Sequence, residues 1–235
     1  MLRKDTTLTQ AFREVAEAHP RRLALKCEST QRTYGQLLEE MERLAGGLRR
    51  LGLVRGERVA LLLPPGEAFA VSFFAVAGVG GVVVPLNPQT RPQGIAQVLR
   101  DAEAAVVISG HPLAQEIRAE VPALRLAVVL EGEGDLHFED LLASPRVHLP
   151  DPAVAPDDLA ALLYTSGTTG SPKGTMHSHR SLIAPVAASV QLRELWLRRF
   201  TPSKVLETAW AVARYGGRLL RAAGRPQTFL STMGW

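Results

Sequence analysis

The sequence has almost no cysteine, because Cys27 is the single thiol among its 235 residues. One cysteine excludes an intrachain disulfide, and this composition suits a reducing compartment. The residues that follow Met1 contain no apolar run of the kind that a signal peptide needs. We therefore expect a cytoplasmic protein. Cys27 ends the stretch Leu23–Cys27, and we expect it to be a small core residue rather than a reactive one.

An unbroken apolar segment is also missing. Residues 68–86 contain no charged side chain over 19 positions, which approaches the length of a membrane span. Gly80 and Pro85 interrupt this segment, and both residue types disfavour a continuous helix. We expect instead a buried helix at Glu67–Val79 followed by a buried strand at Val82–Val84, and no membrane span.

No strong excess of one charge runs through the whole chain. The formal net charge is +4, but residues 1–180 contain 19 basic and 21 acidic side chains. Residues 181–235 contain 8 basic and 2 acidic side chains, so the basic balance belongs to the C-terminal part. Overall charge therefore gives no reason to expect a nucleic-acid partner.

The Walker A pattern of glycine, four residues and Gly-Lys-Ser/Thr is absent. The run Tyr164–Gly174, YTSGTTGSPKG, nevertheless combines glycine, serine, threonine and one lysine. Glycine lets the backbone approach a ligand closely, and successive N–H groups then form a concave anion site. Hydroxyl groups add donors, and lysine adds a point charge suited to phosphate. The apolar Leu159–Leu163 predicts a buried strand that leads into this loop.

A surface loop without a ligand is the alternative, but it gives no reason for a lysine after proline beside a strand end. The stretch TSGTTGSPKG resembles the phosphate loop of the adenylate-forming, or AMP-binding, superfamily. That superfamily includes acyl-CoA synthetases, luciferases and peptide-synthetase adenylation domains. Three upstream segments agree in order: Arg32–Leu37 resembles the TYxEL helix start, Arg55–Leu61 the GDRVAL strand, and Gly80–Pro88 the GAVxVPLNP segment. The resemblance covers about residues 7–184.

Two positions indicate a branch of this superfamily. Peptide-synthetase domains usually have serine at the place of Thr168 and aspartate at the place of Asn87. The resemblance therefore implies an ATP-dependent ligase that activates a fatty or aryl carboxylate as an acyl-adenylate and then joins it to coenzyme A. It also implies Mg²⁺, and it assigns the binding of the β- and γ-phosphates to the loop. The residues with this role are Thr165, Ser166, Gly167, Thr168, Thr169, Gly170 and Lys173.

His179 is the catalytic candidate that the resemblance suggests. It follows the loop in the sequence SHRSL, as a histidine often does in this superfamily, and from there it could approach the acyl site. The other interpretation is a residue at the start of a helix with a partly exposed ring. Both interpretations stay open, and we expect no metal-binding residues in this chain.

Alternating strands and helices predict the fold. The apolar stripe at Tyr34–Leu51 has three- and four-residue steps, which predict a core helix that ends at Gly52. Further strands are expected near residues 59–63, 82–84, 105–108, 126–130 and 159–164, and helices near 67–79, 93–102 and 113–119. Apolar strands separated by helices indicate an α/β fold with a largely parallel sheet flanked by helices. Residues 131–158 are rich in glycine and proline and predict a loop-rich connector.

The motifs by which this superfamily binds adenine, ribose and magnesium, and its C-terminal lysine, have no match here. We therefore divide the chain into a partial AMP-binding domain, 1–184, with the phosphate loop at 164–174, and a divergent basic helical tail, 185–235. Residues 199–207 faintly resemble a helix start found later in the superfamily. Thr201 suits a helix cap there. Three explanations of the tail stay open: a frameshift or deletion product, helices that cover exposed surface, or a basic segment that binds a membrane surface or partner.

The functional prediction is a truncated acyl-CoA ligase with weak or no turnover by itself. The alternative is a non-catalytic fragment that binds nucleotide or pyrophosphate, or a subunit of a split ligase that needs a complementing chain. A product without function, which would aggregate through exposed apolar faces, is a third interpretation.

Overall fold

The structure is a computed structural model that describes residues 5–27, 30–113, 115–165 and 172–199. The chain divides into two compact units, Met1–Ala187 and Ala188–Trp235. The elements below belong to the first unit, except for the second part of the last helix.

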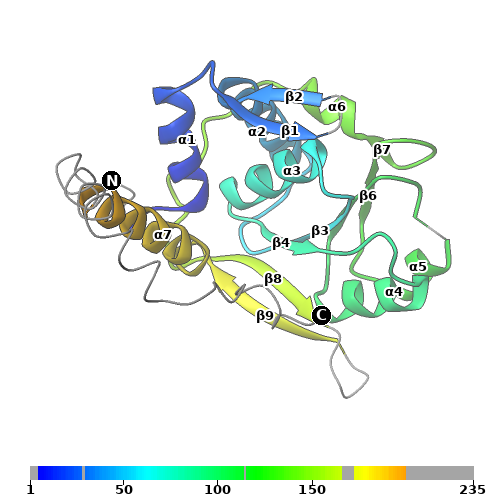
Figure 1. The fold of residues 1–235 in the computed structure, drawn as a ribbon. Coiled ribbons are helices and arrows are strands. Elements are labelled where there is room, and N and C mark those ends of the chain that lie inside the picture. The colour runs from blue at the N-terminus through cyan, green and yellow to red at the C-terminus, as the bar shows by residue number, and fades with distance from the viewer. Residues whose placement is uncertain (1–4, 28–29, 114, 166–171, 200–235) are drawn as a thin grey trace, which may run out of the picture. The chain divides into compact units, whose positions relative to one another are not determined.

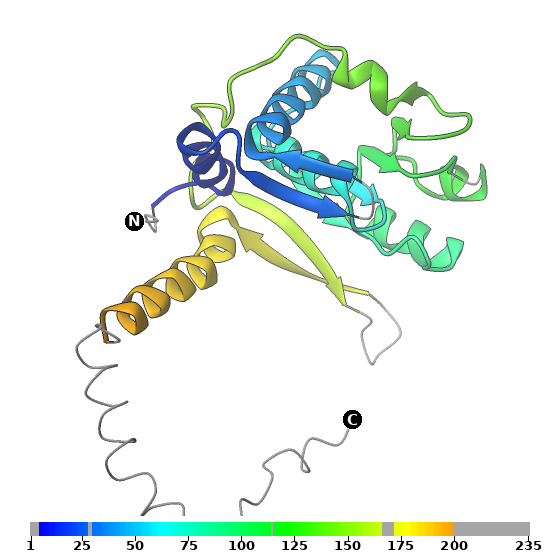
Figure 2. The same ribbon diagram turned by 45° about the horizontal axis from the view of Figure 1, so that its top comes forward.

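A seven-stranded sheet in the order β7-β6-β5-β3-β4-β8-β9 forms the centre of the first unit (Figures 1 and 2). Neighbouring strands are parallel, except for the antiparallel pair of β8 and β9. The strands are β3 (Arg58–Leu62), β4 (Val82–Pro85), β5 (Val106–Ser109), β6 (Leu126–Val129), β7 (Leu136–His137), β8 (Leu159–Thr165) and β9 (Lys173–Ser178). A separate antiparallel pair consists of β1 (Leu23–Cys27) and β2 (Thr30–Thr33).

Helices cover both faces of the sheet. One face carries α1 (Leu8–Ala18), α2 (Tyr34–Arg50), α3 (Glu67–Gly78) and α6 (Phe138–Leu142), and the other carries α4 (Pro92–Asp101) and α5 (Gln115–Glu120). Successive side chains of a strand point to opposite faces. In β3, Val59 and Leu61 pack with α2 and α3, whereas Ala60 packs with α4 and α5. This two-sided burial explains the uniformly apolar strands and confirms the α/β fold with a largely parallel sheet.

The long core helix follows its sequence pattern closely. Thr33 accepts a hydrogen bond from the backbone N–H of Gln36, and the Gln36 side chain accepts one from the N–H of Thr33. This reciprocal cap fixes the start of α2. Gly52 follows its end with φ at 74°, a conformation that suits glycine. The prediction of a helix ending near Gly52 is confirmed.

The uncharged segment at 68–86 forms two buried elements. Helix α3 ends at Gly78, Gly80 turns the chain with φ at 86°, and β4 begins at Val82. The strand is buried at Val82, Val83 and Val84. No helix in the described part of the chain is long and apolar enough to cross a membrane.

Several features differ from the sequence prediction. The connector at 131–158 contains β7 and α6, and an additional strand, β9, follows the loop. Cys27 is half-buried and lies outside the core, because the β1–β2 pair exposes much of its surface. A further helix, α7 (His179–Arg199), follows β9. The helix predicted to begin near Thr201 lies outside the described residues.

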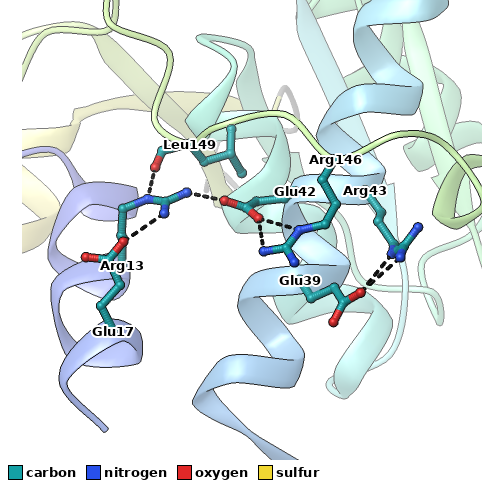
Figure 3. Close-up of polar contacts among 7 residues, drawn as sticks. All are labelled: Arg13, Glu17, Glu39, Glu42, Arg43, Arg146 and Leu149. Carbon is teal, nitrogen blue, oxygen red and sulfur yellow. Dashed lines mark hydrogen bonds and ion pairs between the residues drawn. The ribbon is translucent and has the colours of Figure 1, made fainter. Parts of the chain in front are cut away.

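A buried ion cluster joins three distant segments (Figure 3). Glu42 of α2 is 4% exposed, and Arg13 of α1 is 7% exposed. Arg13 donates to the Glu42 carboxylate and to the carbonyl oxygen of Leu149. Arg146 donates from Nε to the second carboxylate oxygen of Glu42 over 2.8 Å. The cluster therefore fastens α1, α2 and residues 146–149 together.

We expect Glu42→Gln to lower the free energy of unfolding by about 3 kcal/mol, because it removes the buried carboxylate that Arg13 and Arg146 share and leaves Arg13 only the exposed Glu17. Glu39→Gln is the matched control, since Glu39 pairs with Arg43 at 3.0 Å on the exposed face of the same helix. That change should cost no more than about 0.5 kcal/mol. Urea unfolding of both variants measures the difference, and equal losses would contradict a special role for Glu42.

Candidate functional site

The phosphate-loop candidates divide between the described residues and the rest of the loop. Thr165 ends β8, Lys173 begins β9, and the two residues are paired across the antiparallel ladder. Both are exposed. The remaining candidates lie outside the described residues: Ser166, Gly167, Thr168, Thr169 and Gly170. The structure therefore brings together the two ends of the predicted loop, Thr165 and Lys173, which are the loop anchors.

Tyr164 fixes this end of the hairpin. It pairs with Gly174, and a Cβ atom on Gly174 would lie 2.9 Å from Cζ of the tyrosine ring. Glycine therefore leaves the space that the ring occupies. The Tyr164 hydroxyl donates to Oδ2 of Asp101 in α4 over 2.6 Å. Burial and this interaction raise the pKa of Tyr164 above its ordinary value.

A cavity of about 310 Å³ lies beside the loop anchors. It is bordered by Thr165 and Pro172 on one side and by the segment after β4 on the other. In that segment Asn87 accepts a hydrogen bond from the backbone N–H of Gln89 over 2.9 Å, which forms a local turn. Gln97 of α4 adds an amide to the lining. Parallel α/β sheets bind ligands at the carboxyl ends of their strands, and this cavity lies at the carboxyl ends of β4 and β8.

His179 lies at the other end of the hairpin. The pairing of Leu159 with Ser178 places it beside the start of β8, whereas the loop follows the end of β8. Six residues of β9 separate His179 from the loop, a distance of about 20 Å along an extended strand. The structure does not bring His179 to the loop anchors.

The surroundings of His179 differ in one respect from the interpretation as a residue at the start of a helix. It does begin a helix, α7, but its ring is fully buried instead of partly exposed. Nδ1 accepts a hydrogen bond from the N–H of Leu8 over 3.3 Å, and Nε2 has no partner within the described residues. Burial lowers the pKa of His179 to about 4, although the carboxylate of Asp158 partly opposes this effect. The imidazole is therefore neutral at pH 7.

The comparisons with known proteins assign this chain to a family. The sequence profile described as "AMP-binding enzyme" matches residues 12–215. This chain belongs to the AMP-binding enzyme family. The match continues past residue 184 and ends at residue 215.

Named relatives include several CoA ligases of this family. The chain is 35% identical to 4-coumarate–CoA ligase 4 of Arabidopsis thaliana over 67% of its length, and this region covers 30% of that protein. It is 37% identical to a long-chain-fatty-acid–CoA ligase of Thermus thermophilus over 64% of its length, or 28% of that protein. The chain thus spans about a third of the length of the curated relatives it matches.

A solved structure gives the same result. The anthranilate CoA ligase AuaEII, in complex with anthranoyl-AMP, matches with a TM-score of 0.70 and 29% identity. The match covers 76% of this chain and 36% of that one. AMP-binding enzymes of known structure therefore share the α/β sheet that positions the loop anchors here.

We expect Tyr164→Phe to loosen the loop end of the β8–β9 ladder, because it removes the hydrogen bond to Asp101. The loss should be about 1 kcal/mol in stability. Amide hydrogen exchange should become faster at Gly174 and Lys173. Tyr34→Phe is the control, since its ring packs against Phe12 at 5.6 Å and its hydroxyl has no partner among the described residues. Unchanged exchange in Tyr164→Phe would show that Asp101 does not hold the hairpin.

We expect His179 to make the protein less stable in acid. Its pKa rises from about 4 in the fold to about 6.5 in the unfolded chain, so the unfolded state binds more protons between these values. Stability should therefore fall by about 3 kcal/mol as pH decreases from 6.5 to 4.

His179→Asn tests this acid dependence, because an asparagine oxygen can accept the Leu8 N–H bond without titrating. In this variant the unfolding free energy should lose about 3 kcal/mol less than in the wild type as pH decreases from 6.5 to 4. His111→Asn replaces an exposed imidazole and serves as the control. Parallel pH profiles for the wild type and His179→Asn would disprove the assignment.

Proposed function

We propose that this chain supplies the phosphate-binding part of an ATP-dependent ligase that joins a carboxylic acid to coenzyme A. The pairing of Thr165 with Lys173 carries the proposal, because it closes the two ends of the glycine- and threonine-rich loop at the carboxyl edge of the sheet. Membership of the AMP-binding family supports it. The printed names of the relatives, which include fatty-acid, coumarate and anthranilate CoA ligases, support a fatty or aryl acid as substrate.

The reaction has two balanced steps. A carboxylate oxygen of the acid attacks the α-phosphorus of ATP, the bond to the bridging oxygen breaks, and pyrophosphate leaves with that oxygen. The thiol of coenzyme A then loses its proton to a base, and its sulfur attacks the acyl carbon. The acyl–oxygen bond breaks and AMP leaves. Each step moves negative charge onto phosphate oxygens, so a positioned cation and N–H donors accelerate it.

The loop provides these groups for the pyrophosphate end of ATP. Lys173 makes no ion pair with any residue that the structure describes, and its side chain is exposed beside the loop. Its ammonium is therefore available to the β- and γ-phosphates. Thr165 adds a hydroxyl donor. We assign the same binding function to the loop residues Ser166, Gly167, Thr168, Thr169 and Gly170.

Magnesium does not fit the residues that the structure describes. No three histidine, cysteine or carboxylate side chains gather there as a possible metal site. Thr165 and Lys173 supply a hydroxyl and a cation, whereas Mg²⁺ prefers carboxylate and other oxygen ligands. No step of the proposed reaction is assigned to a metal in this chain.

We expect Lys173→Ala to weaken binding of pyrophosphate and ATP at least about tenfold, since one charge-assisted contact to phosphate is lost. Lys26→Ala is the matched control, because Lys26 is an exposed lysine on β1, which is distant from the loop in the sequence. Titration calorimetry at low and high salt measures both variants. Equal affinities for pyrophosphate in the wild type and Lys173→Ala would refute the site.

A further inference from the structure

A second and larger cavity lies at the same edge of the sheet. Its volume is about 650 Å³, and residues at or after the carboxyl ends of β3, β5 and β6 contribute to its lining. Helices α4 and α5 contribute Ile95 and Ile117. Neither Thr165 nor Pro172 borders this cavity, and Thr90 is the one residue that it shares with the cavity beside the loop. The proposed phosphate site therefore leaves it without a function.

The walls of the cavity are mainly apolar and stiff. Leu62, Ile95 and Ile117 supply branched side chains, and Ile95 and Ile117 are each 4% exposed. Proline residues form a further part of the lining: Pro64, Pro88, Pro92 and Pro112. The ring of proline fixes its backbone φ angle, so these segments have little freedom to collapse inward. The volume lies within the range of small-molecule sites in proteins.

One hydroxyl in this apolar lining has no hydrogen-bond partner among the described residues. Ser109 ends β5, lines the cavity and is 3% exposed. Its hydroxyl makes no hydrogen bond with any residue in the described part of the chain. A ligand oxygen in the cavity would supply such a partner, because a serine hydroxyl both donates and accepts.

The charges around the cavity disfavour an anion. No lysine or arginine is among the lining residues. Glu131 is the one carboxylate of the lining; its side chain is 79% exposed and lies 4.0 Å from the imidazole of His111, which is 81% exposed. A carboxylate or phosphate deep in the cavity would have no lysine or arginine beside it, and burial of such an uncompensated charge is expensive.

We propose that this cavity binds an uncharged, mainly apolar molecule that carries one hydroxyl or carbonyl oxygen, and that Ser109 makes the hydrogen bond to that oxygen. The site is separate from the phosphate loop. A two-ring phenol has the required size, polarity and charge, so 2-naphthol is a suitable probe. Its carboxylate analogue, 2-naphthoate, has nearly the same shape but carries a negative charge at pH 7.

The experiment compares the two probes on the full chain by titration calorimetry. We expect 2-naphthol to bind and 2-naphthoate to bind at least about tenfold more weakly, because its carboxylate would be buried without a lysine or arginine partner. Ser109→Ala should weaken naphthol binding about fivefold, the effect of one hydrogen bond. Equal affinity for both probes, or no change in Ser109→Ala, would overturn the proposal.

A second variant blocks the cavity. A Cβ atom on Gly110 would meet only Cδ of Pro64, at 3.9 Å, so a side chain can begin there without a backbone clash. Gly110→Leu should abolish naphthol binding and leave pyrophosphate binding unchanged. Lys173→Ala should have the opposite pattern. Naphthol binding that survives Gly110→Leu would place the ligand elsewhere and refute the site.

Discussion

The buried carboxylate of Glu42 is the interaction on which the placement of the candidate site depends. Residues 143–158 have no regular structure, yet they carry the chain from α6 to the start of β8. An irregular segment of this length loses conformational entropy on folding and has no helix or strand hydrogen bonds of its own, so contacts with other elements must hold it in place. Glu42 provides two of them, through Arg146 and through Arg13, which also binds the carbonyl of Leu149 (Figure 3). Removing the Glu42 charge leaves the buried Arg13 with the exposed Glu17 as its remaining ion-pair partner.

Further contacts continue this line of anchors toward the hairpin. The N–H of Asp151 donates to the carbonyl of Gly78 over 2.8 Å, and Arg55 donates to Asp158 over 2.5 Å. The carbonyl of Asp158 then accepts from the N–H of His179, the residue that starts α7. The connector and α7 therefore fix the end of the β8–β9 hairpin where Leu159 pairs with Ser178. Tyr164 fixes the opposite end, which carries the loop. This separation explains why His179 is a buried structural neighbour of Leu8 instead of a partner of the loop.

Sequence periodicity was sufficient for the elements that local signals define. The stripe and caps of α2, the glycine turn before β4 and the apolar strands all follow from spacing and residue type. The sequence alone gave no sign of the close approach between α2 and the connector. Glycine weakens a helix interior, but a Cβ on Gly46 would lie 2.1 Å from the carbonyl oxygen of Pro145, so tertiary packing requires glycine there.

In the candidate site, too, the sequence predicts features that depend on neighbouring residues and misses those that depend on distant ones. The composition of residues 164–174 predicted an anion site, because glycine, hydroxyl groups and lysine act within a single loop. The burial of His179 and the unpaired hydroxyl of Ser109 depend on residues distant in the sequence, and no local pattern encodes them. The positions of the charged side chains also depend on the fold. Lys173 lies at the β8–β9 hairpin, whereas no lysine or arginine lines the larger cavity. Because interaction between opposite charges falls with distance and with solvent screening, Lys173 can favour phosphate at the loop without making the apolar cavity a site for anions. The carboxyl edge of the sheet thus carries two neighbouring cavities with different linings, and Thr90 borders both of them.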